Sequence, residues 1–148
     1  MKEKLVLIGN GMAGVRTLEE LLKLAPDKYD ITVFGAEPHP NYNRILLSPV
    51  LTGEKQFNEI VLNDDAWYAE HGITLHKGKT VTEINRKQRY VKTGDATVAF
   101  YDRLLLATGS NPFLLPVPGK DLPGVIGFRD FADVETMLKA AHAYRHAV

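Results

Sequence analysis

Apolar and polar residues follow one another along this 148-residue chain in the patterns of strands and helices in turn. An unbroken apolar run at residues 5–8 is typical of a strand buried on both faces of a parallel sheet. Apolar residues then recur at three- and four-residue spacing from Val15 to Leu22, which predicts an amphipathic helix that Pro26 ends. A β-branched run at residues 30–34 completes a strand–helix–strand unit, which predicts an α/β fold with a right-handed crossover.

The later elements are shorter. A stretch rich in proline and asparagine, residues 37–57, is expected to be a long irregular connection, and such connections are often binding elements or lids. Further along, we expect a helix from Asn63 or Asp64 to Gly72, strands at 73–75 and 80–84, an antiparallel hairpin around the Gly94-Asp95 turn, a fully buried strand at 104–106 and a last helix over roughly 130–147. The whole order predicts a central parallel sheet with a small antiparallel β insertion.

Composition narrows the classes of function. The 18 Lys and Arg residues balance the 18 Asp and Glu residues, so no overall basic field would attract nucleic acid or an anionic membrane. The sequence shows no apolar stretch of membrane-spanning length and no signal peptide, which favours a cytoplasmic protein. Because it contains no cysteine, a disulfide framework, an iron–sulfur cluster and a redox dithiol are excluded within these residues.

A glycine-rich motif lies directly between the first strand and the first helix. Residues 9–14 read Gly-Asn-Gly-Met-Ala-Gly, the GxGxxG spacing. In this position the first glycine permits a tight turn, the second leaves room for a diphosphate, and the third lets helix and strand pack closely. Backbone N–H groups at the positive helix end would then bind the phosphates. The predicted pyrophosphate-binding residues are Gly9, Gly11, Met12, Ala13 and Gly14.

An acid in the expected place accompanies the motif. Glu37 follows the second strand, roughly 20 residues beyond the last glycine, where a carboxylate accepts hydrogen bonds from the ribose of a dinucleotide. The plainer alternative is that the glycines only pack a strand–helix turn and that Glu37 is a solvated loop acid. The combination of strand, motif, helix and acid favours dinucleotide binding.

Taken together, these segments resemble a known family over essentially the whole chain. IGNGMAG with Glu37, and YDRLLLATGSNPF followed by PGKDLPGV, resemble the FAD-binding domain of the glutathione-reductase-like flavoproteins. The middle segment YNRILLSPVL is similar to the Tyr-x-Arg and Leu-Ser element of the ferredoxin-reductase and nitrite-reductase branch, above all to the N-terminal flavin domain of NAD(P)H-dependent nitrite reductase large subunits. The fold implied by this resemblance is a Rossmann-like FAD/NAD(P)-binding domain.

The resemblance also implies roles for individual residues. Ala107, Thr108 and Gly109 would form a second wall beside the FAD pyrophosphate, Arg44 would lie along the adenine or phosphate side, Ser48 would run toward the flavin, and Val81 would offer backbone bonds to adenine. The disulfide reductases of the superfamily carry cysteines near the flavin. Since this chain has none, transfer from flavin to a dithiol within it is excluded.

An activity follows from the same resemblance. In the full-length protein, electrons from NAD(P)H would reach FAD and then iron–sulfur and sirohaem centres in later domains, reducing nitrite to ammonia in nitrate assimilation. Residues 1–148 would be the FAD-binding domain at the N-terminus of that longer oxidoreductase, without its NAD(P)H-binding and later domains. The expected partners are therefore FAD and the missing C-terminal domains, and we expect the chain alone to be inactive.

Two other functions stay open at this point. One is a ferredoxin or rubredoxin reductase that passes electrons to a separate carrier protein, and the other is a non-enzymatic nucleotide-sensing module. No side chain is predicted to be a catalyst, and Trp67 and Tyr68 are interpreted as packing residues. His142 and His146 share a predicted helix face, but no third ligand accompanies them, so we expect no metal site.

Overall fold

The computed structural model describes residues 2–144, which divide into two compact units. Among these residues, the first unit contains 2–42 and 61–109, and the second contains 43–60 and 110–144. Each unit is therefore assembled from two segments that are not contiguous in the sequence.

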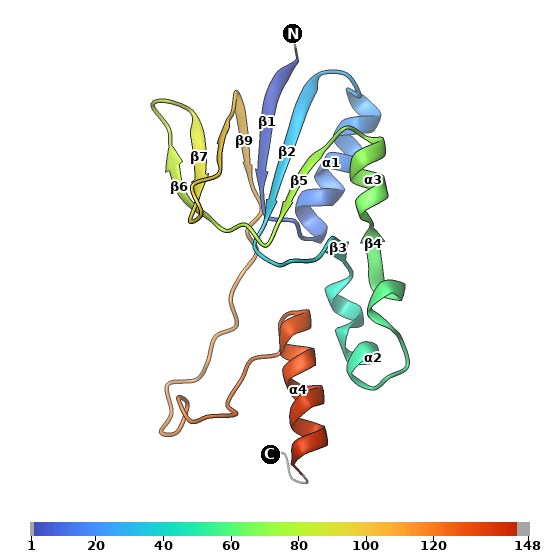
Figure 1. Ribbon diagram of the computed structural model, residues 1–148, viewed down its shortest axis with the longest axis vertical. Helices are drawn as coiled ribbons and strands as arrows, with labels where there is room; N and C mark the ends of the chain where they lie inside the picture. Colours follow the sequence, from blue (N-terminus) through green and yellow to red (C-terminus); the bar gives the residue numbers. More distant parts are fainter. Residues whose placement is uncertain (1, 145–148) are drawn as a thin grey trace. The chain divides into compact units, whose positions relative to one another are not determined.

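A four-stranded parallel sheet forms the centre of the first unit (Figure 1). Its strand order is β5-β2-β1-β9, where β1 is Glu3–Ile8, β2 is Tyr29–Gly35, β5 is Thr74–Lys77 and β9 is Arg103–Leu106. Ile8, at the end of β1, is paired with Phe34 on one side and Leu106 on the other. The carboxyl ends of these three strands consequently lie at one edge, and the predicted parallel α/β fold is confirmed.

Two helices cover one face of the sheet, α1 (Met12–Leu24) and α3 (Asp65–Glu70) (Figure 1). Alternate strand residues face these helices, because side chains alternate between the two sides of a strand. The buried cluster consists of Leu5, Leu7, Val15, Leu18, Ile31, Val33, Tyr68 and Ile73. Asp64, one of the two predicted starts, caps α3 by accepting a hydrogen bond from the Trp67 N–H at 2.9 Å.

A three-stranded antiparallel sheet packs against the other face. It comprises β6 (Val81–Asn85), β7 (Tyr90–Thr93) and β8 (Val98–Phe100), and its buried Val91 joins the cluster of Val6, Ile8 and Phe34. The hairpin around Gly94-Asp95 and the small antiparallel insertion are thus confirmed. A short separate pair, β3 (Asn41–Tyr42) with β4 (Val61–Asn63), completes the unit.

The prediction of a fully buried strand at residues 104–106 is wrong. Leu104 and Leu105 are half-buried, and Leu106 is 59% exposed. The reason is the place of β9 in the sheet: within residues 2–144 it pairs with β1 alone and forms an edge. An apolar run indicates a strand, but it does not tell a central strand from an edge strand.

The second unit contains the helical elements η1 (Arg44–Leu46), α2 (Leu47–Leu51), η2 (Phe57–Ile60) and α4 (Phe131–Ala143). Helices α2 and α4 contact each other, and the rings of Phe57 and Phe131 lie 4.2 Å apart. The expectation of an irregular connection over 37–57 is therefore wrong in large part. One local cause is Asn43, whose side chain accepts a hydrogen bond from the Ile45 N–H and begins η1.

Helix α4 is shorter than predicted. It begins with a capping box, in which Asp130 and Asp133 each accept a backbone hydrogen bond of the other. It ends at Ala143, and Tyr144 is extended and 73% exposed. The predicted residues 145–147 lie outside the described range. No helix within residues 2–144 is both long and apolar enough to span a bilayer.

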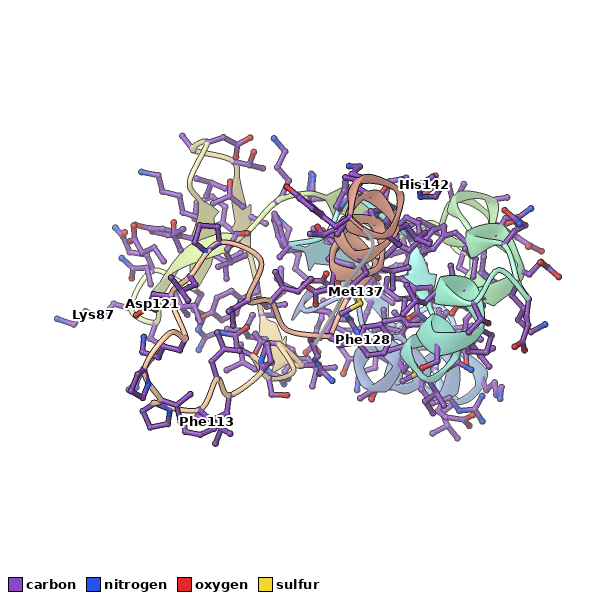
Figure 2. The ribbon with its side chains drawn as sticks, turned by 90° about the horizontal axis from the view of Figure 1, so that it is seen from below. Lys87, Phe113, Asp121, Phe128, Met137 and His142 are labelled. Carbon is purple, nitrogen blue, oxygen red and sulfur yellow. The ribbon has the colours of Figure 1, made fainter. Side chains whose placement is uncertain are left out.

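The segment from 110 to 128 contains no helix or strand. Phe113 is 80% exposed. Figure 2 labels its side chain on the loop that this segment forms. The other exposed large apolar residues of this segment are Leu114, Leu115, Val117, Leu122, Val125, Ile126 and Phe128.

Candidate functional site

The loop between β1 and α1 turns sharply at Gly9, whose φ of +112° is a conformation that L side chains rarely adopt. A Cβ at this position would lie 2.1 Å from the carbonyl oxygen of Ala107, so the residue after β9 packs directly on the turn. The Gly9 N–H donates to the carbonyl of Phe34 at 2.8 Å. The loop is therefore held between the ends of β2 and β9.

Gly14 lies on the buried side of the first turn of α1. A Cβ there would be 2.9 Å from the carbonyl oxygen of Gly9 and 3.1 Å from the side chain of Leu7. The close approach of helix to strand that was predicted for the last glycine of the motif is confirmed.

Gly11 has the opposite surroundings. It is the N-cap of α1, and a Cβ built on it would meet no protein atom within 4 Å. No side chain caps this helix end, and no acidic residue lies in its first turn. The first N–H groups of a helix have no acceptor in the preceding turn, and with the helix dipole they favour an anion. The geometry at Gly11, Met12 and Ala13 therefore fits a diphosphate.

Glu37 follows the end of β2, the neighbour of β1, and is half-buried. Its Oε2 accepts a hydrogen bond from the hydroxyl of Tyr42 at 2.6 Å. Tyr42 is only 4% exposed, so the donor is fixed by the core. The structure thus holds an oriented carboxylate beside the strand that leads into the glycine loop.

Two polar contacts of the glycine loop were missed from the sequence. The side chain of Asn10 accepts a hydrogen bond from the Tyr68 hydroxyl at 2.7 Å and donates one to the carbonyl of His39 at 3.4 Å. Tyr68 is buried, as its predicted packing role requires, but its hydroxyl has a specific partner as well. Asn10 and Tyr68 are 58 residues apart, so no local pattern could indicate the pair.

Beyond β9, Ala107 is half-buried, and its N–H donates to the carbonyl of Ile8 at 2.8 Å. Thr108 and Gly109 are exposed, and Gly109 has a φ of +74°. Ala107 therefore belongs to the wall around the glycine turn, while the next two residues lie at its surface.

The remaining predicted residues belong to other elements. Arg44 and Ser48 belong to the second unit, where the Arg44 guanidinium donates to the carbonyl of Arg129 at 3.2 Å and Ser48 is exposed on α2. Val81, in the first unit, begins β6 and packs against the cluster of Val6 and Phe34. The structure brings the motif glycines together with Ala107, whereas it does not test the roles expected of Arg44, Ser48 and Val81.

An open depression of about 800 Å³ lies at the opposite edge of the first unit. Its lining includes Lys2, which precedes β1, and Asp27, which follows α1, together with Arg16, Trp67 and His71. Ligands of open α/β sheets bind outside the carboxyl ends of the strands, so this depression is not the dinucleotide site.

No group of three His, Cys, Asp or Glu within residues 2–144 could hold a metal ion. His142 is exposed, and its Nδ1 lies 2.7 Å from the carbonyl oxygen of Leu138. His146, the other member of the pair considered from the sequence, lies outside the described residues.

A parallel sheet, a glycine turn into an uncapped helix, and an acid after the neighbouring strand define the first unit as a dinucleotide-binding α/β domain. The family model for the pyridine nucleotide-disulphide oxidoreductases matches residues 3–148, and the chain belongs to that family. Membership implies the binding of FAD and NAD(P)H.

Individual relatives agree with this assignment. The chain is 53% identical over 146 residues to a nitrite reductase (NAD(P)H) of Bacillus subtilis (strain 168), which covers 99% of the chain and 18% of that protein. It is 50% identical over 146 residues to the assimilatory nitrate reductase electron transfer subunit of the same organism, covering 99% of the chain and 19% of that protein. The likeness to nitrite reductases expected from the sequence is confirmed, and the chain spans about a fifth of the length of these relatives.

The fold has a counterpart among solved structures. The ferredoxin reductase for the CYP199A2 system from Rhodopseudomonas palustris superposes with a TM-score of 0.86 at 24% identity. The match covers 96% of this chain and 35% of the other. At this identity the likeness shows the fold alone.

Proposed function

We propose that this chain is the FAD-binding part of a longer NAD(P)H-dependent oxidoreductase that reduces nitrite to ammonia. The observation that carries the dinucleotide site is the uncapped start of α1, with open space where a side chain of Gly11 would be. Support for nitrite as the substrate is the 53% identity to a nitrite reductase, which extends over 18% of that protein.

The residues of the first unit fit FAD. The N–H groups of Met12 and Ala13 would bind the diphosphate, and Glu37, oriented by the Tyr42 hydroxyl, would accept hydrogen bonds from the ribose. Thr108 and Gly109 would line the exposed side of the glycine turn. FAD, when bound, supplies the redox chemistry. The protein's part is to bind and orient the cofactor.

Other roles depend on the family resemblance. Arg44 would lie along the adenine or phosphate side, Ser48 would run toward the flavin, and the backbone of Val81 would bond to adenine. NAD(P)H would bind in a further domain of the same polypeptide, and the iron–sulfur and sirohaem centres would belong to later domains.

A second candidate differs only in the electron acceptor. The chain is also 50% identical to a protein named as an electron transfer subunit of assimilatory nitrate reductase. This similarity favours a reductase that delivers electrons to another protein, as a ferredoxin or rubredoxin reductase does. The spacing of cysteines in the rest of the polypeptide distinguishes the two, since an iron–sulfur centre of the same chain requires thiolate ligands.

Titration of the purified chain with FAD, followed by flavin fluorescence, tests the proposal. We expect saturable binding with a Kd on the order of micromolar or lower, tighter than the binding of NAD⁺. Glu37→Gln is expected to raise the Kd for FAD about ten-fold or more, because it removes a charged hydrogen-bond acceptor.

Glu83→Gln is the matched control, since Glu83 also accepts a hydrogen bond from a tyrosine hydroxyl, that of Tyr90 at 2.8 Å, but on the antiparallel sheet. It is expected to leave the Kd unchanged. Preference for NAD⁺ over FAD would support the nucleotide-sensing module instead, and absence of FAD binding would refute the proposal.

A further inference from the structure

The side chain of Asn10 is held by groups that are distant in the sequence. Its Oδ1 accepts from the Tyr68 hydroxyl at 2.7 Å, and its Nδ2 donates to the carbonyl of His39 at 3.4 Å. A Cβ at Gly35 would lie 2.8 Å from the Cβ of Asn10, so Asn10 also packs on the end of β2. Asn10 therefore joins the loop that begins α1, the turn that carries Glu37, and helix α3.

The core fixes the donor of the first of these bonds. Tyr68 is 2% exposed, belongs to the cluster under α1, and lies edge-on to the ring of Trp67 at a centroid distance of 5.0 Å. Burial raises the pKa of its phenol well above the ordinary value, so the hydroxyl remains a protonated donor. A buried ring packed on several sides has little room to move its hydroxyl.

We propose that Tyr68 is a positioning residue of the dinucleotide site, which acts through Asn10 to hold the phosphate-facing loop and the Glu37 turn in one fixed arrangement. The inference rests on the proposed function and extends that function by assigning a role in binding to a residue of α3. A loop that is ordered before binding loses less entropy when the ligand arrives, which strengthens binding without any new contact.

A role of Tyr68 in packing alone differs from the positioning role in the part of the side chain that it requires. A phenylalanine at position 68 fills nearly the same volume, so a purely structural role requires the ring and not the hydroxyl. The positioning role requires the hydroxyl and its partner Asn10 together. Tyr68→Phe and Asn10→Ala, alone and combined, separate the two roles.

The first test needs no flavin. Hydrogen–deuterium exchange is measured at the two hydrogen-bonded amides that flank the loop, Gly9, which donates to the carbonyl of Phe34, and Val15, which donates to that of Gly11. The proteins compared are the 148-residue chain, Tyr68→Phe and the control Tyr90→Phe. The control also removes a tyrosine hydroxyl that donates a hydrogen bond, to Glu83 at 2.8 Å, but on the antiparallel sheet. We expect Tyr68→Phe to speed exchange at Gly9 and Val15 about three- to ten-fold and Tyr90→Phe to leave it unchanged. Equal exchange in all three proteins would overturn the inference, whatever the chain binds.

The second test measures the Kd for FAD. Tyr68→Phe is expected to raise it about three- to ten-fold, and the same change in an Asn10→Ala background is expected to add nothing further. Independent, additive effects of the two substitutions would contradict the inference. If Tyr68→Phe fails to fold, Asn10→Ala breaks the same bond from the other end, and its exchange rates at Gly9 and Val15 decide the question. A wild-type chain that binds no FAD would refute the proposed function, while the exchange result would still report on the loop.

Discussion

The first unit and the segment at 110–128 are both rich in apolar residues, but these residues have opposite surroundings. Leu7, Val15 and Leu18 are completely buried, whereas Phe113 is 80% exposed and Leu115 is 66% exposed. In the first unit, apolar residues recur with the period of a strand or a helix, so each faces a neighbouring element. The segment at 110–128 is interrupted by proline and glycine and has no such period. Apolar content therefore forms a core only where a regular element directs it to one side.

A second contrast lies within the glycine motif. Gly9 and Gly14 are required because protein atoms crowd them, whereas Gly11 faces open space. The motif thus combines two glycines that the fold requires with a third, Gly11, beside which the fold leaves open space. Substitutions at these positions should separate stability from binding.

The largest expected effect is on Gly9. Gly9→Ala introduces a Cβ 2.1 Å from the Ala107 carbonyl oxygen at a φ of +112°, and we expect it to lower the free energy of unfolding by about 3 to 5 kcal/mol. Gly11→Ala is the matched control. With a φ of −93° and no atom within 4 Å, it should change stability by only about 0.5 kcal/mol. Urea unfolding measures both, and equal losses would contradict the difference between the two glycines.

The next prediction tests the contrast between the core of the first unit and the segment at 110–128. Leu18→Ala removes a completely buried side chain and should lower the free energy of unfolding by about 2 to 5 kcal/mol. Leu122 is 63% exposed, so Leu122→Ala should lower the free energy of unfolding by no more than about 0.5 kcal/mol. Trp67 is the only tryptophan and lies in the first unit, so its fluorescence follows that unit during unfolding. A large loss for Leu122→Ala would show that the segment is packed after all.

The smallest expected effect concerns the ordered part of the second unit. Asp130→Ala removes the N-cap of α4 and should cost about 1 kcal/mol, while Asp130→Asn keeps a capping side chain and should cost less. The loss should be visible in the helical signal of far-ultraviolet circular dichroism. An equal shift in the Trp67 transition would mean that the two units unfold together rather than separately.

The sequence was sufficient for the features that depend on short-range pattern. The GxGxxG motif, the acid after the second strand and the Asp64 cap each lie within a few residues of the element that they define, and the structure contains all three elements. The parallel sheet followed from a strand–helix–strand order whose connection is sterically constrained.

Features that depend on contacts between residues distant in the chain could not be predicted from the sequence. The exposure of Leu106 depends on which strands pair with β9, and the partner of the Tyr68 hydroxyl is 58 residues away in the chain. Proline and asparagine are typical of loops, and they mask the helical turns at 44–51, where Asn43 caps a helical turn and Pro49 lies inside α2. Proline is tolerated there because the first turn of a helix needs no N–H at that position.

A crystal structure of the chain grown with FAD tests the central claim most directly. The proposed site predicts density for the diphosphate at the start of α1, within hydrogen-bonding distance of the N–H groups of Met12 and Ala13, with the ribose at Glu37. A flavin bound elsewhere, or a cofactor whose diphosphate does not approach Gly11, would contradict it.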